Sequence, residues 1–485
     1  MRKLWKLKFI PNPRRPRPLA VDESELGMSP AAGRSARNNG HCPWGSIVPA
    51  LALALLGFAA ASGAVSATGS TAAPDHIALT WTADPLTTQT VTWRTASGVK
   101  TGMVRYQEGD TLTASAVTAP ARGAAFVNDL GTDTLFTAEI SGLKENTKYS
   151  YQVGDGNVWS PAGAFTTGTP VEFEFLIFGD SQSGSSELIY APWKETVHNA
   201  IRDNPGARFF VNVGDLVEIG HGEAHWNAWF DAAAGVIDHI PEMAVQGNHE
   251  TLVGAGRSDH LKPDFMTRQL PVPQNGPEGL KGQVYSYDFG CAHIVVLDSQ
   301  QQEEQPVYGD ILKAQTAWLD QDLARTRRAW TFVFFHKPPY SNTPDRMNDD
   351  VKGAFGPVLD AHHADVVFNG HDHDYSRTFP MLADHAVNAY AKGTVYMVVG
   401  RSGNKFYDDL TAKSWNAFFY NPKDQPMYLD VKVSPGKLTV TARKSDGTRI
   451  EEFIMAKALQ GLSRVVPVSH KHPPVKAVTA PPTAP

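Results

Sequence analysis

Between residues 77 and 156, apolar and polar residues alternate in short segments that turn residues separate at regular intervals. Alternation with a period of two predicts β-strands that each bury one face, and no helical period occurs between them. The segments are residues 77–83, 90–96, 102–108, 135–143 and 148–156. The pattern predicts an all-β sandwich, which we place at residues 74–170.

From residue 172 onward the apolar runs are continuous instead of alternating. They are residues 173–178, 208–213, 242–246, 293–298, 330–335, 365–369 and 394–400. Strands that are apolar on both faces are covered by helices, and a helical pattern fits residues 187–203, 222–238, 311–328 and 350–363. Antiparallel strands are expected at residues 426–433, 437–443 and 450–456. We therefore predict an α/β domain over residues 172–457.

The two ends of the chain differ from these domains. Residues 47–61, "IVPALALALLGFAAA", form an apolar run that Arg34 and Arg37 precede and that small residues follow. This is typical of a signal peptide, so we expect residues 1–67 to be a leader and the protein to be exported, secreted or periplasmic, with no membrane span in the mature chain. An N-terminal membrane anchor is the alternative. Residues 459–485 hold six prolines and predict a disordered tail.

The net charge and the number of cysteines limit which partners, disulfides and metal sites the protein can have. The first 67 residues hold nine Lys and Arg and three Asp and Glu, so the rest of the chain has a net charge of −12, against −6 for the whole. An acidic protein is a poor ligand for a phosphate backbone, and we expect no nucleic acid partner. Of the two cysteines, Cys42 lies in the leader and Cys291 is left alone. A disulfide within the mature chain and a cysteine-based zinc site are therefore excluded.

Five of the continuous apolar runs end in a polar cluster. The clusters are Gly179-Asp180, Gly214-Asp215, Gly247-Asn248-His249-Glu250, His336 and Gly370-His371-Asp372-His373. Each alone has an ordinary explanation as a turn or a surface histidine. Loops at the carboxyl ends of strands meet at one edge of an α/β sheet, however, so these side chains are expected to converge. Carboxylate, amide and imidazole donors suit divalent metals, and a pair of metals favours attack at phosphorus.

The ordered set of clusters resembles the calcineurin-type metallophosphoesterases, and within them the purple acid phosphatase-like branch. The string "GHDHDYSR" at residues 370–377 is similar to the Gly-His-x-His-x-Tyr-x-Arg signature of that branch. Its members carry an N-terminal fibronectin type III-like domain, and "LKENTKYSYQV" at residues 143–153 resembles that domain, although another small sandwich fits equally well. The resemblance implies an αββα sandwich for the second domain.

The resemblance also implies a site with two metal ions. Asp180, Asp215 and His373 would hold the first ion, and Asp215 would bridge to a second ion held by Asn248, His336 and His371. A hydroxide activated by the metals would attack phosphorus. His249 would protonate the leaving oxygen, and Glu250 would orient His249.

Two departures from the family pattern concern the first metal. Glu218 stands where the purple branch has a tyrosine, so no ferric-tyrosinate centre is expected. Gln182 stands where many relatives outside the purple branch have a histidine. Either residue could supply an oxygen ligand, which would favour Mn, Mg or Fe(II) over Zn at that ion. Gln182 could instead form a hydrogen bond behind the ligands, and the choice among Mn, Zn, Fe and Mg stays open.

Two residues are candidates for contact with the substrate, and each has a structural alternative. Asp345 and Arg346 replace a histidine pair of the plant members, so Arg346 is a candidate to bind a phosphate oxygen, or else a solvent-exposed loop charge. Tyr375 is a second candidate, although with Arg377 it could simply support the loop that carries the two histidines. Residues 251–283 form a long loop that is expected to influence substrate selection.

We therefore expect a dimetal phosphoric ester hydrolase with a small phosphorylated substrate, acting as an acid phosphatase-like phosphomonoesterase. A phosphodiesterase or nucleotidase on the same site is the alternative within enzymes. An inactive, metal-bearing binding protein is a third hypothesis, and the presence of His249 argues against it because binding alone requires no proton donor. The sequence leaves the oligomeric state open.

Overall fold

The computed structural model describes residues 69–254, 256, 259–390 and 392–457. The predicted leader at residues 1–67 and the predicted tail at residues 459–485 lie outside these ranges and stay predictions. Among the described residues, no helix is both long enough and apolar enough to cross a membrane.

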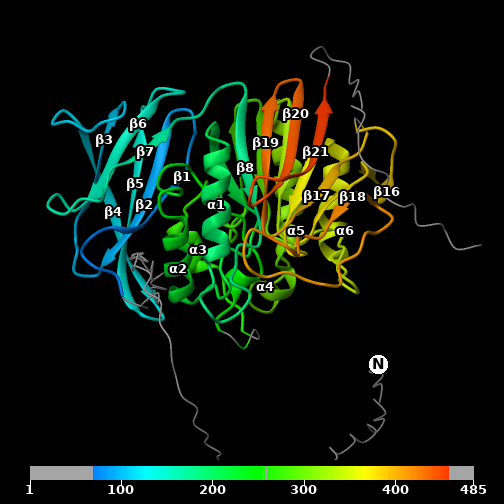
Figure 1. The fold of residues 1–485 in the computed structure, drawn as a ribbon, viewed down its shortest axis with the longest axis horizontal. Helices are drawn as coiled ribbons and strands as arrows, with labels where there is room; N and C mark the ends of the chain where they lie inside the picture. The colour runs from blue at the N-terminus through cyan, green and yellow to red at the C-terminus, as the bar shows by residue number, and fades with distance from the viewer. Residues whose placement is uncertain (1–68, 255, 257–258, 391, 458–485) are drawn as a thin grey trace, which may run out of the picture. The chain divides into compact units, whose positions relative to one another are not determined.

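The first domain is the predicted all-β sandwich (Figure 1). Its strands are β1 (Asp75–Thr80), β2 (Thr88–Ala96), β3 (Gly102–Glu108), β4 (Val117–Asn128), β5 (Gly131–Ser141), β6 (Lys148–Gly154) and β7 (Gly163–Thr166), paired in the order β1-β2-β5-β4-β3-β6-β7. Strand β4 pairs with β3 through its first half and with β5 through its second half, so it joins the two sheets. Buried aromatic side chains, among them Trp93, Phe136 and Tyr151, fill the space between the sheets.

The sequence pattern missed β4 and β7. Most side chains of β4 are exposed, and Phe126 is its one fully buried apolar residue, so the strand has almost no apolar face to detect. Backbone pairing to β3 and β5 holds it in place instead. Strand β7 has four residues, too few for an alternating pattern to be read.

The second domain contains two facing sheets. One has the order β21-β20-β19-β8-β9 and the other the order β10-β11-β12-β13-β17-β14-β18. The first is built from β8 (Phe173–Phe178), β9 (Ala207–Asn212), β19 (Met427–Ser434), β20 (Lys437–Lys444) and β21 (Arg449–Ala456). The second is built from β10 (Tyr285–Phe289), β11 (Ala292–Val296), β12 (Trp330–Phe334), β13 (Val366–Asn369), β14 (Tyr375–Thr378), β17 (Val395–Val399) and β18 (Asn416–Tyr420). A small hairpin, β15 (Met381–Leu382) and β16 (His385–Ala386), lies apart from them.

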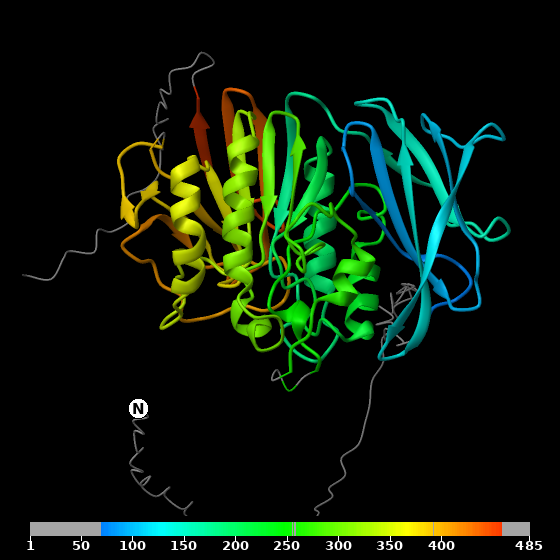
Figure 2. The same ribbon diagram turned by 180° about the vertical axis from the view of Figure 1, so that it is seen from behind.

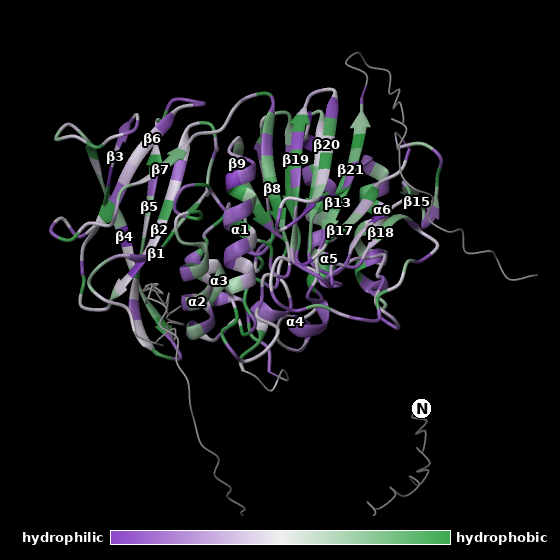
Figure 3. Ribbon diagram, viewed as in Figure 1, coloured by the Kyte–Doolittle hydropathy of each residue, from purple (hydrophilic) through white to green (hydrophobic). Residues whose placement is uncertain are grey.

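Helices cover the outer face of each sheet, which gives the predicted αββα sandwich (Figures 1 and 2). Helices α1 (Ala191–Asp203) and α2 (Glu223–Ala233) belong to the core on the outside of β8, whereas α5 (Ile311–Arg325) and α6 (Asp349–His362) belong to the core on the outside of β11. Within β8, Phe175 and Ile177 enter the core between the sheets, while Leu176 and Phe178 face the helices. Burial on both faces explains why these strands are apolar throughout, and Figure 3 shows hydrophobic stretches along them.

The elements differ from the predicted ones in three respects. Residues 242–246 form no strand, although the Met243 and Val245 amides donate to the carbonyls of Phe210 and Asn212, both at 3.0 Å, so the segment still follows β9. Two short helices were not predicted, α3 (Asp264–Gln269) and α4 (Gln301–Tyr308). Strands β10, β14 and β18 were not predicted either: polar residues interrupt the apolar residues of β10 (YSYDF) and β14 (YSRT), and β18 (NAFFY) is only partly buried.

Candidate metal centre

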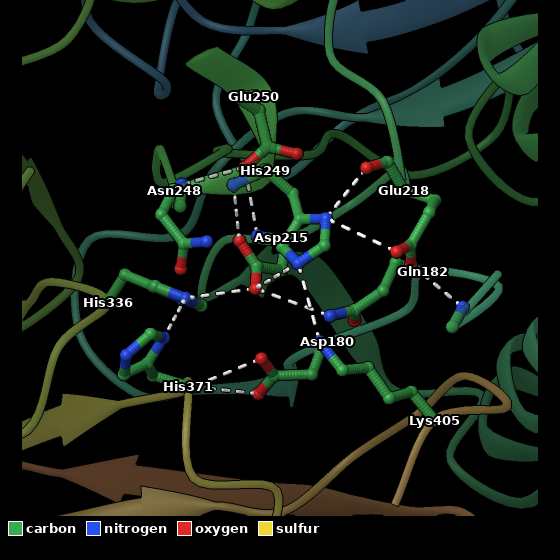
Figure 4. Close-up of polar contacts among 12 residues, drawn as sticks. Asp180, Gln182, Asp215, Glu218, Asn248, His249, Glu250, His336, His371 and Lys405 are labelled. Atoms are coloured by element: carbon green, nitrogen blue, oxygen red, sulfur yellow. Dashed lines mark hydrogen bonds and ion pairs between the residues drawn. The ribbon is translucent and has the colours of Figure 1, made fainter. Parts of the chain in front are cut away.

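The polar clusters that follow the strands converge at one place, as Figure 4 shows for the labelled side chains. Asp180 follows β8, and Asp215 follows β9. His336 follows β12, while His371 and His373 lie in the short connection between β13 and β14. Asn248 immediately precedes a single 3₁₀ turn, η1 (His249–Thr251). Five separate chain segments thus supply the predicted metal ligands.

Within the described residues, two groups of three side chains have the arrangement of a metal site. Asp180, Asp215 and His373 form one group, and Asp215, His336 and His371 form the other. In each group the candidate ligand atoms lie within 4.8 Å of one another. Asp215 belongs to both groups, so its carboxylate is placed to bridge two ions. This grouping is the one that the family resemblance implied for these five residues.

The backbone at the site is strained. Asp180, Asp215, His371 and His373 have φ angles of 51°, 54°, 74° and 64°, in the left-handed region that residues other than glycine rarely adopt. Such conformations cost about 1–3 kcal/mol each and persist where surrounding contacts enforce them. Here the Asp180 amide donates to the Gly214 carbonyl at 3.1 Å, and the His371 amide donates to the Asp180 carboxylate at 3.0 Å. Four of the ten described residues other than glycine that have a positive φ are candidate ligands, which indicates a functional site.

Two histidine rings are fixed by their second nitrogen. Nδ1 of His336 donates to the Val213 carbonyl at 2.8 Å, and Nδ1 of His373 donates to the Lys405 carbonyl at 2.8 Å. Each bond occupies Nδ1 and leaves Nε2 directed at the aspartates. Nε2 of His336 lies 3.2 Å from Asp215 Oδ2, and Nε2 of His373 lies 3.3 Å from Asp180 Oδ1.

Several buried nitrogen and oxygen atoms at the site have no hydrogen-bond partner among the described residues. They are Nε2 of His373, Oδ1 of Asn248 and Oε1 of Gln182. A buried polar atom without a partner costs about 1–3 kcal/mol, and each of these atoms is of a type that binds cations. The electrostatics agree: burial opposes ionisation of Asp215, yet the adjacent His336 and His249 hold its pKa well below the usual range. The donor set therefore fits divalent metal ions.

The two candidates for an additional oxygen ligand lie differently. The Gln182 side chain is fully buried, and its amide nitrogen donates to Asp215 Oδ2 at 3.2 Å. Glu218 accepts a hydrogen bond from the Gly184 amide at 2.8 Å and lies 3.8 Å from Nδ1 of His249. Gln182 thus contacts the shared carboxylate, whereas the Glu218 carboxylate contacts the Gly184 amide and lies near His249.

His249 is buried next to the shared carboxylate. Its Nδ1 donates to the Glu218 carbonyl at 2.7 Å, and its Nε2 lies 3.8 Å from Asp215 Oδ2. The ring is therefore oriented by a backbone carbonyl, with Nε2 directed toward the two metal groups. Burial lowers the pKa of His249, and the nearby Lys405 lowers it further, against the opposing effect of Asp215.

The structure gives Glu250 another role than the predicted one. Its carboxylate accepts hydrogen bonds from the backbone amides of Asp215 at 2.9 Å, Leu216 at 2.8 Å, Val217 at 3.3 Å and Gly247 at 2.7 Å. These bonds tie the loop that carries Asp215 to the loop that carries Asn248. The expectation that Glu250 orients His249 is corrected accordingly, because the Glu218 carbonyl performs that function.

Neither candidate substrate residue has a hydrogen bond to Asp180 or Asp215 among the described residues. Nη1 of Arg346 donates to the His371 carbonyl at 3.0 Å and to Asp372 at 2.7 Å, so it braces the histidine loop. Tyr375 is fully buried, and its hydroxyl donates to Glu451 at 2.6 Å. These contacts turn the phenol into the core, which corrects its candidacy as a substrate contact.

The segment after β17 also contacts the site, although none of the predicted ligands lies in it. The Ser402 amide donates to the Gly179 carbonyl at 2.7 Å, and the Gly403 amide donates to the Asp180 carbonyl at 3.0 Å. Farther along, the Lys405 ammonium lies 3.4 Å from Nε2 of His249. The available signal was the string "GRSGNK" at residues 400–405, which is a sixth polar cluster with glycine at the end of an apolar run.

Family comparisons agree with this architecture. Residues 74–167 match the purple acid phosphatase N-terminal domain, and residues 173–375 match the calcineurin-like phosphoesterase domain. A purple acid phosphatase of Glycine max is 28% identical over 287 residues, which cover 54% of this chain and 59% of that protein. An uncharacterized protein of Mycobacterium tuberculosis is 25% identical over 324 residues, which cover 58% of this chain and 59% of that protein.

The matched regions thus span less than two thirds of these relatives. The solved structure of a purple acid phosphatase isolated from yellow lupin (Lupinus luteus) seeds shares the fold, with a TM-score of 0.67 at 18% identity, covering 80% of this chain and 75% of that one. Both matched domains, their order along the chain and the shared fold lead to one conclusion. The chain belongs to the calcineurin-type metallophosphoesterases, in the purple acid phosphatase-like branch with an N-terminal fibronectin type III-like domain.

Proposed function

We propose that this protein is a dimetal phosphoric ester hydrolase whose substrates are small phosphomonoesters. One observation carries the proposal: Asp215 belongs to two groups of candidate ligands, each with its donor atoms within 4.8 Å of one another. A carboxylate shared in this way suits two ions held close together, which is the arrangement that favours displacement at phosphorus.

When bound, the metals would acidify a water molecule and neutralise charge on the phosphoryl oxygens. Asp180, Asp215, His373 and Gln182 would hold the first ion, and Asp215, Asn248, His336 and His371 the second. The first set contains three oxygen donors and one imidazole, so we propose Mn, Mg or Fe(II) there. With Glu218 in place of the family's tyrosine, the set includes no phenolate for a ferric-tyrosinate centre.

His249 would act as the general acid. Hydrolysis forms a bond between a water oxygen and phosphorus and breaks the bond between phosphorus and the ester oxygen, which leaves with a proton. The Nδ1 proton of His249 is held by the Glu218 carbonyl at 2.7 Å. Protonation of the ring therefore occurs at Nε2, on the side of the metal groups, and Nε2 is the atom that would deliver the proton.

The test is turnover of p-nitrophenyl phosphate and of its diester, bis(p-nitrophenyl) phosphate, after chelation and after Mn, Zn, Fe or Mg is added back. We expect metal-dependent turnover with preference for the monoester, and loss of both bound metal and activity in Asp215→Asn. Asp203→Asn, on the surface at the end of α1, is the matched control and should behave as wild type.

Preference for the diester would contradict the proposal and indicate a phosphodiesterase. Metal-loaded protein that turns over neither ester would refute hydrolysis and favour a binding protein. In His249→Ala, retained metal with activity reduced by about 100-fold or more is expected, because general acids contribute about 10²–10⁴-fold. Unchanged activity in that variant would reject the acid role.

A further inference from the structure

The segment of residues 402–405 is held firmly against the first metal group. In addition to the bonds from Ser402 and Gly403, the Asn404 amide donates to the Gln182 carbonyl at 3.2 Å. A Cβ at Gly403 would lie 2.5 Å from the carbonyl oxygen of Gln182, so only glycine permits this approach. In addition, Nδ1 of His373 donates to the Lys405 carbonyl at 2.8 Å. The backbone of Lys405 is thus positioned by the candidate metal ligands themselves.

The Lys405 side chain extends from this segment toward His249, as Figure 4 shows. Its ammonium lies 3.4 Å from Nε2 of His249 and 5.5 Å from the centre of the Tyr407 ring. By contrast, Lys423 pairs with Asp408, and Lys444 pairs with Asp424. In the described part of the chain, the ammonium of Lys405 faces aromatic rings instead of a carboxylate.

A lysine beside the nitrogen that would deliver a proton is poorly placed for a purely structural role. The Lys405 ammonium lies 3.4 Å from Nε2 of His249 and pairs with no carboxylate among the described residues, so an anionic oxygen placed next to it would accept a charge-assisted hydrogen bond from the lysine. The phosphoryl group of a substrate bound beside His249 carries such oxygens. The other candidate cation, Arg346, is already engaged by the His371 carbonyl and by Asp372.

We propose that Lys405 is a substrate-binding residue that donates to a non-bridging phosphoryl oxygen and thereby selects phosphomonoester dianions over diesters. This inference rests on the proposed function. A monoester presents two negative charges on its non-bridging oxygens near neutral pH, and a diester presents one. An additional cation at that position therefore attracts the monoester more strongly. The second ester group of a diester also replaces one oxygen that could accept from the lysine.

The experiment compares wild type, Lys405→Met and Lys405→Arg with the control Lys413→Met, which removes a lysine from the same chain segment outside the site. For Lys405→Met, we expect kcat/KM for p-nitrophenyl phosphate to fall about 10- to 100-fold, with metal content unchanged. For bis(p-nitrophenyl) phosphate it should fall less than about threefold. Lys405→Arg should recover part of the loss, since it retains the charge, and Lys413→Met should match wild type.

A second measurement does not depend on turnover. Isothermal titration of the metal-loaded proteins with inorganic phosphate should give a Kd about tenfold or more higher for Lys405→Met than for wild type and for Lys413→Met. Equal phosphate affinity, or equal losses of kcat/KM on both esters, would overturn the inference. Absence of turnover in wild type would count against the proposed function instead, and the phosphate titration would still decide the role of Lys405.

Discussion

Replacing Glu250 with glutamine distinguishes the role seen in the structure from the role that the sequence suggested. The carboxylate of Glu250 accepts four backbone hydrogen bonds, two at each oxygen. In Glu250→Gln one oxygen is replaced by an NH₂ group, which donates and cannot accept. Two of the four backbone amides therefore lose their acceptor, whichever way the new side chain is turned. All of these groups are buried around Asp215, so water cannot replace the lost bonds.

The expected size of the effect follows from those two amides. A buried donor left without an acceptor costs about 1–3 kcal/mol, so Glu250→Gln should lower the free energy of unfolding by about 2–6 kcal/mol. One oxygen accepts from Asp215 and Gly247 and the other from Leu216 and Val217, so either orientation disturbs the loop that carries Asp215, and metal affinity should fall together with stability. Chemical denaturation and metal analysis of the purified variant measure these two effects. Glu452→Gln, on the partly exposed side of β21, is the control and should remain within about 0.5 kcal/mol of wild type.

The refuting result is equally specific. If Glu250 oriented His249, Glu250→Gln would unfold like wild type and retain its metals, but its pH–rate profile would shift as the proton donor changed environment. Stability and metal content equal to wild type, combined with such a shift, would show that the bonds to the Asp215 loop are unimportant. Loss of stability with an unshifted profile would support the structural role.

Three further expectations can be tested together. His293 lies between Asp288 at 2.7 Å and Asp322 at 2.8 Å, and although burial opposes its charge, these carboxylates raise its pKa to about 9. A pKa raised from 6.5 contributes stability that is fully present below pH 6.5 and is lost as the pH rises through 9, and the loss is at most about 3 kcal/mol of unfolding free energy. Denaturation at pH 6 and at pH 10 should show this loss in wild type but not in His293→Asn. Equal losses in both proteins would contradict the expectation. Tyr375→Phe removes a buried hydrogen bond to the carboxylate of Glu451 and should lower the unfolding free energy by about 2 kcal/mol with KM unchanged, whereas a raised KM at unchanged stability would restore Tyr375 as a substrate contact. Chelation should lower the unfolding free energy by about 2.7 kcal/mol relative to protein with free metal at 100 times its Kd, and denaturation curves that do not respond to metal would exclude tight binding to the native state.

The fold could be predicted where packing leaves a pattern in the sequence. Strand β8 places Phe173, Phe175 and Ile177 in one core and Leu176 and Phe178 in the other, and this is the signal of a strand buried on both faces along most of its length. Strand β4 leaves no such signal, because backbone pairing rather than side-chain burial fixes it. Residues 242–246 gave a misleading signal, since a buried segment is apolar whether or not it completes a strand.

The candidate ligands could be predicted for a related reason. All but Asn248 follow a strand, and Asn248 follows the buried segment of residues 242–246 that runs beside β9, so chain order and the convergence of these ends were enough to bring the ligands together. The direction of a side chain within a loop is not contained in that information. Glu250 adjoins His249 in the sequence, yet its carboxylate turns back to the amides of residues 215–217. Lys405 is 156 residues from His249, and only the docking of residues 402–405 on the Asp180 loop brings the two together.

The same contacts explain how a strained site is maintained. Four candidate ligands adopt left-handed backbone conformations, and together these cost about 4–12 kcal/mol. The strain persists because the loops hold one another: Glu250 holds the Asp215 loop, Asp180 accepts from the His371 amide, and residues 402–404 bind the Asp180 loop. Each loop is therefore both a source of ligands and a support for its neighbours. A substitution in any one of them should disturb ligands in another, so metal loss by itself does not identify a residue as a ligand, and unfolding measurements must accompany metal analysis.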